Sequence, residues 1–269
     1  MKTSSCVSAL AFDAIAPEFD TRFGEWRSVA AQRRAVRTAL LCSFPRVGYI
    51  LELGGGTGLD AAFLGEHGFE VLLTDPSPTM VQIARSRLLP FGSEAALVAA
   101  EDLEEFGECH ISEGGRLFDG AFSNFAPLNC VANLDGVARG LARMLKPGAP
   151  AMLVLFGTCC LGEILTELLR GRPKQALRRF RRNDVQARLG KHEFAVTYHR
   201  RTALMRAFAP WFVFEKQIGI GVTVPPSAAE PWISKHPRLL SNMERLDRAL
   251  SSPFACFADH VLYQFRKIG

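Results

Sequence analysis

A short apolar segment followed by a cluster of glycines constrains the fold of this chain more than any other feature. Residues 49–53 (YILEL) read as a buried strand, and residues 54–58 (GGGTG) follow it directly. Residues 59–67 continue as a short helix, which Gly68 is placed to end. A strand, a glycine loop and a helix in this order direct backbone N–H groups and the positive end of the helix towards a ligand. The segment therefore predicts an α/β fold with a ligand-binding loop at this point.

Strand-like and helix-like segments alternate along most of the chain. Predicted strands lie at 49–53, 69–74, 96–99, 118–123, 151–156, 211–220 and 260–265, and predicted helices lie at 59–67, 77–88, 134–145, 202–208 and 239–250. Most of these strands are nearly continuous apolar runs, which is typical of parallel strands buried on both faces. The alternation therefore predicts a doubly wound α/β sheet with helices on both sides.

Residues 158–200 interrupt this alternation. The segment reads as two short helices on either side of Pro173, without strands. We therefore expect a single domain over residues 1–269 that carries a helical lid insertion. Its parts are an N-terminal helical segment (1–45), a core with the glycine loop (46–157), the helical insertion (158–200) and the C-terminal part of the core (201–269).

Composition disfavours several classes of protein. Hydrophobic residues make up 48% of the 269 residues and charged residues 22%, values that are average for globular proteins. No run approaches the roughly 20 apolar residues of a membrane span. The N-terminus turns acidic where a secretory signal would stay apolar. The seven cysteines contain no CxxC pair and predict reduced thiols, so we expect a cytoplasmic protein without a metal site.

The spacing of the glycines disfavours two common nucleotide sites. Gly54, Gly56 and Gly58 form the pattern, and Leu59 stands where the dinucleotide fingerprint GxGxxG needs its third glycine. No Lys-Ser or Lys-Thr pair follows, so the loop is not a phosphate-binding P-loop. Leu59 together with Glu52 disfavours a nicotinamide-dependent dehydrogenase.

Residues 52–58 (ELGGGTG), followed by a strand that ends in Asp75, resemble the class I S-adenosylmethionine-dependent methyltransferases. The resemblance runs from Phe12 to about Gly157. It implies that residues 1–45 form an N-terminal helical lid, 46–157 the cofactor-binding core and 158–200 a helical cap over the substrate. It implies a seven-stranded, mostly parallel sheet with an antiparallel last strand, and S-adenosyl-L-methionine as the cofactor. By itself it says almost nothing about the methyl acceptor.

The resemblance also implies roles for residues around the loop. Glu52 would hold the amino group of the cofactor or organise the loop, and Asp75 would accept hydrogen bonds from both ribose hydroxyls. Ala99 stands where the family usually has an acid for the adenine amino group, so Glu101 or Asp102 would supply it, and we prefer Asp102. The residues expected to bind the cofactor are Phe19, Arg22, Glu52, Gly54, Gly55, Gly56, Gly58, Asp75, Pro76, Ser77, Met80, Glu101, Asp102, Leu103, Asn124 and Phe125.

Residues 12–20 (FDAIAPEFD) resemble the lead-in with which many small-molecule methyltransferases close a lid over the cofactor. Phe12 is accordingly expected to face the substrate, together with Asn129 and His199. His199 and His260 are the histidines best placed to act as a general base. An ordinary structural role remains the stronger interpretation for each of them.

One local patch carries the excess of positive charge. The chain has a net charge of +5, and residues 170–182 hold seven basic residues and no acidic one, which leaves 25 basic and 27 acidic residues elsewhere. Lys174, Arg178, Arg181 and Arg182 fall on one face of a predicted amphipathic helix at 174–182. This helix is interpreted as a solvated cap surface, as an attractor of an anionic substrate or carrier, or as a peripheral contact with a membrane.

The sequence therefore indicates methyl transfer to an O, N or C atom of a small, apolar or lipid-like natural product. The 20 phenylalanines favour an apolar pocket, whereas three tyrosines and three tryptophans offer little stacking surface for nucleic acid. The alternative is a catalytically silent subunit that binds the cofactor and only positions a partner.

Overall fold

The computed structural model describes residues 4–24, 26–180 and 184–269. Its strands are β1 (Tyr49–Leu53), β2 (Glu70–Asp75), β3 (Glu94–Leu97), β4 (Gly120–Ser123), β5 (Pro150–Phe156), β6 (Val185–Leu189), β7 (His192–Val196), β8 (Phe212–Ile220) and β9 (His260–Lys267). Its helices are α1 (Ser4–Asp13), α2 (Ala16–Gly24), α3 (Arg27–Ser43), α4 (Leu59–Glu66), α5 (Pro78–Leu88), α6 (Leu103–Ser112), α7 (Asp135–Met144), α8 (Leu161–Leu169), α9 (Pro173–Ala176), α10 (Arg201–Phe208) and α11 (Pro237–Leu250).

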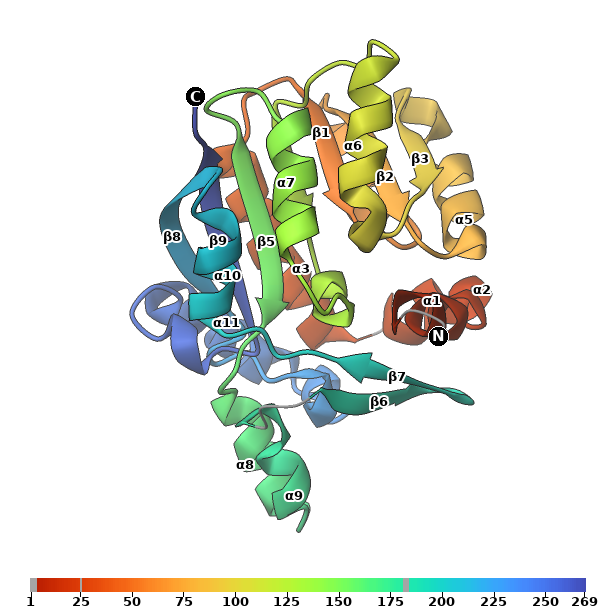
Figure 1. The fold of residues 1–269 in the computed structure, drawn as a ribbon. Coiled ribbons are helices and arrows are strands. Elements are labelled where there is room, and N and C mark those ends of the chain that lie inside the picture. The colour runs from red at the N-terminus through yellow and green to blue at the C-terminus, as the bar shows by residue number, and fades with distance from the viewer. Residues whose placement is uncertain (1–3, 25, 181–183) are drawn as a thin grey trace.

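The large sheet has seven strands in the order β3-β2-β1-β4-β5-β9-β8 (Figure 1). β1 to β5 pair in parallel, and β9 lies antiparallel between β5 and β8. The predicted seven-stranded sheet with an antiparallel last strand is confirmed. β1 and β4 are neighbours although the chain first builds outwards through β2 and β3, and ligands of doubly wound folds bind where the strand order reverses in this way.

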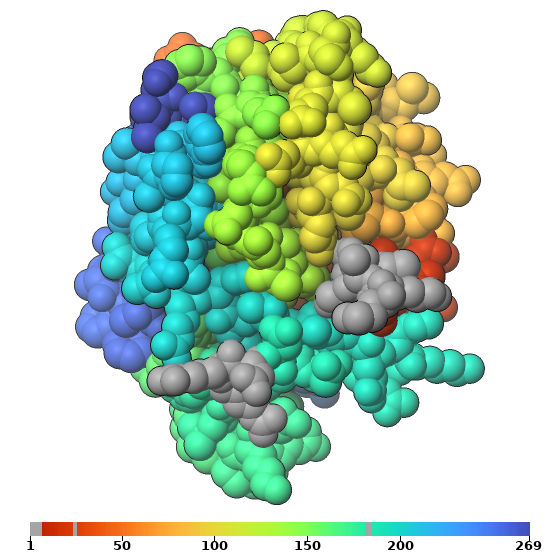
Figure 2. Space-filling model, in the orientation of Figure 1, coloured from red at the N-terminus to blue at the C-terminus, as the bar shows by residue number. Residues whose placement is uncertain are grey.

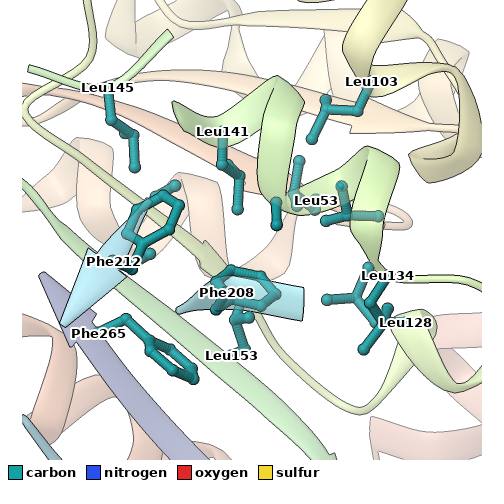
Figure 3. Packing of buried hydrophobic residues seen from close by; sticks show 14 of the residues in the cluster. Leu53, Leu103, Leu128, Leu134, Leu141, Leu145, Leu153, Phe208, Phe212 and Phe265 are labelled. Carbon is teal, nitrogen blue, oxygen red and sulfur yellow. The ribbon is translucent and has the colours of Figure 1, made fainter. Parts of the chain in front are cut away.

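Helices cover both faces of the sheet, as the side chains of β1 require. Leu51 and Leu53 belong to a core with α6, α7 and α10, in which Leu141 and Phe208 are fully buried (Figure 3). Ile50 packs on the opposite face in a second core with α3, α4 and α5. Because helices bury both faces of β1, its sequence is a nearly continuous apolar run.

Segments from distant parts of the sequence cover the carboxyl edge of the sheet. In Figure 1, α1, α2 and the β6–β7 hairpin lie across the edge at which β1 and β5 end. Phe194 and Val196 of β7 pack against Ala11 of α1. The crevice between β1 and β4 is therefore roofed by protein on this side.

The sequence analysis predicts an insertion made only of helices, and this prediction is wrong because the insertion also contains two strands. After α8 and α9, β6 and β7 form an antiparallel hairpin with Val185 opposite Val196 and Ala187 opposite Phe194. The apolar residues of β6 recur at every second position, which is the pattern of a strand with one buried face. The prediction of helices overlooks this alternation because it recognises strands mainly as continuous apolar runs, and polar residues interrupt both β6 and β7.

The predicted amphipathic helix at 174–182 is also wrong. α9 ends at Ala176, and a 3-10 turn follows at Arg178–Phe180. Arg181 and Arg182 lie outside the described residues. Arg179 is buried rather than solvated, because it binds acidic groups in the interior.

The surface view shows that the segment around α8 and α9 projects from the body of the molecule, below the hairpin (Figure 2). Within the described ranges, every helix is too short or too polar to cross a lipid bilayer.

Candidate active site

Glycine is required at two positions of the loop for two different reasons. At Gly55 a Cβ atom would lie 2.4 Å from Leu73 Cδ1, so close packing beneath the loop excludes any side chain. Gly56 has a φ of +55°, and a Cβ there would meet only Met80 Sδ, at 4.0 Å. The backbone of Gly56 is therefore bare towards open space, which is what a ligand in contact with the loop requires.

Asp75 lies at the end of β2 and faces the same space. Its carboxylate accepts hydrogen bonds from the backbone N–H groups of Gly56 and Ser77, each at 2.9 Å. Burial raises the pKa of Asp75 to about 6, although these two hydrogen bonds oppose the shift. The Ser77 hydroxyl accepts a bond from the Met80 N–H at 3.2 Å and caps α5, as the sequence predicts.

Glu52 is a buried acid with an unpartnered oxygen. Its side chain is only 2% exposed, and among the described residues no hydrogen-bond partner meets Oε2. Burial, and then the charge of Asp60, raise the pKa of Glu52 well above its usual range. Asp60 itself is held by Arg33 at 2.9 Å and by Arg37 at 2.7 Å. Glu52 therefore offers a buried acceptor that a cationic donor would satisfy.

The turn after β4 places an aromatic ring beside this acid. Phe125 and Ala126 both adopt positive φ angles, of 58° and 63°, which are rare for residues with a side chain. Asn124 stabilises the turn by donating to Asp60 Oδ2 and by accepting the Phe125 N–H, each at 2.8 Å. The guanidinium of Arg33 lies 4.6 Å from the centre of the Phe125 ring.

Two aspartates fasten the N-terminal helices over the loop, and sequence reasoning assigns them no role. Asp13 accepts a hydrogen bond from the Ser77 hydroxyl at 2.7 Å. Asp20 accepts one from the Thr57 hydroxyl at 2.7 Å and pairs with Arg87 at 2.7 Å. The Phe-Asp pair that occurs twice in residues 12–20 could have predicted these contacts. In each pair the phenylalanine lines a cavity and the aspartate holds its helix in place.

Two adjoining cavities open at the carboxyl edge. The first, of about 300 Å³, is lined by Asp75 and Met80 on one side and by the β6–β7 hairpin on the other. The second, of about 360 Å³, contains Glu52 and His260. The glycine loop and the turn at Asn124 and Phe125 form walls of both.

The structure brings most of the residues predicted from the sequence to these cavities. Those that line at least one of them are Phe12, Phe19, Glu52, Gly54, Gly55, Gly56, Asp75, Pro76, Met80, Asn124, Phe125, Asn129 and His260. Those that line neither are Arg22, Gly58, Ser77, Glu101, Asp102, Leu103 and His199. Phe156 and Tyr198 also line the first cavity, and nothing in their local sequence distinguishes them.

The predicted acids after β3 differ in their surroundings. Asp102 is exposed, Glu101 is half-buried, and Leu103 is fully buried in the core. Burial, and then the charge of Glu101, raise the pKa of the Cys130 thiol to about 11. Cys130 lines the first cavity, so Glu101 lies near that cavity without lining it.

His199 is a structural histidine in this fold. It is buried, and its Nε2 lies 3.2 Å from the carbonyl oxygen of Leu128 and 2.9 Å from that of Val131. Burial lowers the pKa of His199, although these two contacts oppose the shift. Asn129 also links segments, since it donates to the Thr197 carbonyl at 2.6 Å while it lines the first cavity.

His260 lines the second cavity at the start of β9. Its ring lies 4.9 Å from the Phe156 ring and 6.0 Å from the Phe125 ring, measured between centres. Its Nδ1 is 3.3 Å from Asp259 Oδ2, an ion pair when the imidazole is protonated. Burial alone would raise the pKa of Asp259, but its contacts with His260 and Arg179 hold it well below its usual range.

Arg179 connects the insertion to this edge of the sheet. It donates to Glu163 Oε2 through Nε at 2.9 Å and to Asp259 Oδ1 at 2.6 Å. It also donates to the backbone carbonyl oxygens of Asp259 at 2.7 Å and Gly157 at 3.1 Å. All three charged side chains are buried, so the root of the insertion is fixed by a fully paired ionic cluster.

Comparisons with known proteins agree with this geometry. Residues 50–148 match the family model described as a methyltransferase domain. The uncharacterised methyltransferase YodH of Bacillus subtilis is 31% identical over 127 residues, which cover 42% of this chain and 53% of YodH. The match thus spans about half the length of that relative.

Solved structures share the fold. A methyltransferase of Methanosarcina mazei superposes with a TM-score of 0.56 at 17% identity, covering 86% of this chain and 97% of that one. The geranyl diphosphate C-methyltransferase of Streptomyces coelicolor superposes with a TM-score of 0.53 at 12% identity, covering 88% and 79%. Residues 50–148 therefore form a methyltransferase domain, and the sheet order and the glycine loop agree with the fold of class I S-adenosylmethionine-dependent methyltransferases.

Proposed function

We propose that this chain transfers the methyl group of S-adenosylmethionine to an O, N or C atom of a small apolar or lipid-like molecule. The observation that carries the proposal is that the acids suited to the cofactor and a set of aromatic rings line the same pair of cavities. Phe12, Phe156 and Tyr198 supply large apolar surfaces for an acceptor. The Streptomyces enzyme, named for geranyl diphosphate, exemplifies a lipid-like acceptor on this fold.

The residues of the cavities fit the cofactor. The unpartnered oxygen of Glu52 suits the cofactor's ammonium group, and the bare backbone of Gly56 admits its methionine and ribose portions. Asp75 keeps acceptor capacity for the ribose hydroxyls beyond its two N–H bonds. Glu101 and Asp102 line neither cavity, and for the adenine amino group we favour the half-buried Glu101 over the exposed Asp102.

S-adenosylmethionine supplies a methyl carbon activated by its positive sulfur, and the carbon–sulfur electron pair returns to sulfur as the acceptor's pair forms the new bond. The protein's part is to align the acceptor, exclude water and place charge correctly. Phe125 and Phe156 provide apolar walls beside His260. An acceptor that starts protonated passes its proton to His260, whose protonated form Asp259 stabilises. His199 is not suited to this role because its Nε2 already contacts two carbonyl groups.

Isothermal titration with S-adenosylhomocysteine tests the cofactor site. We expect micromolar binding, and we expect Asp75→Ala to weaken it about tenfold or more, because a charge-assisted pair of hydrogen bonds is lost. Asp102→Ala is the matched control and leaves the affinity unchanged, since it removes an exposed carboxylate. Folded protein that binds no S-adenosylhomocysteine would eliminate the proposal.

Turnover of labelled S-adenosylmethionine against a panel of phenols, amines and prenylated acceptors tests the catalytic role. A silent subunit would bind the cofactor and label nothing without a partner chain. His260→Ala should slow transfer to protonated acceptors while leaving the affinity for S-adenosylhomocysteine intact. We also propose a cytoplasmic location, supported by cysteines without a CxxC pair, which cell fractionation tests.

A further inference from the structure

The outward face of α8 is made of leucines. Leu161, Leu165, Leu168 and Leu169 are 50%, 61%, 51% and 80% exposed. They follow the i, i+4, i+7 and i+8 spacing, so they form one stripe about 100° wide on the helix. An apolar stripe normally faces the core, and this one faces away from it.

The acidic residues of α8 point in the opposite direction. Glu163 and Glu167 are buried, two and six residues after Leu161 and therefore on the other side of the helix. Glu163 binds Arg178 and Arg179, and Glu167 pairs with Arg170 at 3.3 Å. The helix has thus turned its carboxylates inwards and its leucines outwards.

Cations follow the leucine stripe at its end. Arg170, Arg172 and Lys174 are exposed, and so are Leu177 and Phe180, at 56% and 53%. Residues 158–180 contain no acidic side chain besides the two buried glutamates. We call residues 161–180 the α8–α9 projection, since Figures 1 and 2 show it standing out from the body.

We propose that the α8–α9 projection docks on the surface of an anionic lipid bilayer. Its leucines and Phe180 enter the boundary between headgroups and acyl chains, and Arg172 and Lys174 contact lipid phosphates. Charge decides against a second copy of this chain as the occupant. A second copy would add the same exposed cations to the contact, and residues 161–180 expose no acid that could pair with them.

Docking would bring the candidate active site to the membrane. Glu163, Arg178 and Arg179 of the projection are also walls of the second cavity. Under the proposed function, on which this step rests, an amphiphilic acceptor therefore reaches the cavity from the lipid surface. The docking itself does not depend on catalysis.

Co-sedimentation with sucrose-loaded vesicles tests the docking. We expect the full chain to bind phosphatidylcholine vesicles that contain about one-third phosphatidylglycerol, to bind pure phosphatidylcholine weakly, and to be released by high salt. Leu169→Glu should lower the partition coefficient roughly tenfold, because it buries a charge in the interface. The matched control is Leu89→Glu, which alters a leucine 79% exposed in the turn after α5 and should change nothing. Arg172→Ala and Lys174→Ala should each cost about fivefold.

Three results would overturn the docking proposal. These are absence of binding to anionic vesicles, equal binding by Leu169→Glu and the original chain, and a solution dimer that Leu169→Glu dissociates in analytical ultracentrifugation. Circular dichroism without vesicles shows that each variant is folded. Protein that binds S-adenosylhomocysteine but not anionic vesicles refutes the docking alone, and protein that binds vesicles but not S-adenosylhomocysteine refutes the proposed function alone.

Discussion

The burial of Asp75 should make cofactor affinity depend on pH. Burial raises the pKa of this carboxyl to about 6, against the hydrogen bonds from Ser77 and Gly56, and the charge of Asp13 reinforces the shift. Only the ionised form can accept from two ribose hydroxyls while it also accepts two N–H groups. At pH 5 about one-tenth of Asp75 is ionised, so affinity for S-adenosylhomocysteine should fall about tenfold from its value at pH 7.5, or ~1.4 kcal/mol.

Isothermal titration at both pH values checks this, with Asp75→Asn as the matched control. Asparagine does not titrate, so the change of affinity in that variant reports the other acids, chiefly Glu52, whose pKa burial also raises. Between pH 7.5 and pH 5, the original chain should lose about tenfold more affinity than Asp75→Asn loses. Equal pH dependence in the two proteins would refute the reasoning.

The same raised pKa has the opposite effect on the stability of the chain without the cofactor: a rise in pH lowers the free energy of unfolding. The pKa of Asp75 is about 6 in the folded chain and 3.8 at its ordinary value, so the folded state holds the proton more tightly. This contribution, about 3 kcal/mol, is fully present below the ordinary pKa and is lost as the pH rises through about 6. The free energy of unfolding of the original chain, measured in urea, should therefore fall between pH 4 and pH 7.5 relative to that of Asp75→Asn, which does not titrate.

Three further predictions concern parts of the site that can be changed separately. Arg179→Met should lower the free energy of unfolding by about 3–5 kcal/mol in urea titrations, because Glu163 and Asp259 lose their buried partner; a loss below 1 kcal/mol would contradict the ionic cluster. Gly56→Ala should abolish binding of S-adenosylhomocysteine, whereas Gly92→Ala, which imposes similar strain at a φ of +63° with nothing within 4 Å, should destabilise by about 1–2 kcal/mol and keep binding. Asp20→Ala should weaken that binding about fivefold by releasing α2 from the loop, a modest effect because the pair with Arg87 is partly exposed.

Features that depend on neighbouring residues could be predicted from the sequence. The buried strand, the glycine loop and the Ser77 cap are each encoded within a few positions, and all form as expected. The pairing of these pieces into one site followed from the doubly wound topology, which brings Asp75 to the loop across 19 residues. Short-range signals and a single topological rule were sufficient for this half of the site.

The insertion depended on partners that the sequence does not reveal. Arg178 and Arg179 look like two members of a solvated basic run, yet both face Glu163, which lies 15 and 16 residues earlier. Asp259, the other partner of Arg179, is 80 residues away. His199 and His260 are equally plausible bases in the sequence, and only the folded contacts separate a histidine held by carbonyls from one that lines a cavity.

The β6–β7 hairpin forms one wall of the first cavity that can vary independently of the large sheet. Its backbone hydrogen bonds are internal to a separate two-stranded sheet, and the cross-strand pairs Val185–Val196 and Ala187–Phe194 line the first cavity opposite Asp75. Exchanging those four side chains reshapes one wall without touching the strands that carry the glycine loop. Under the proposed function, acceptor preference would therefore change through these four positions, while the glycine loop and Asp75 keep their places on the sheet.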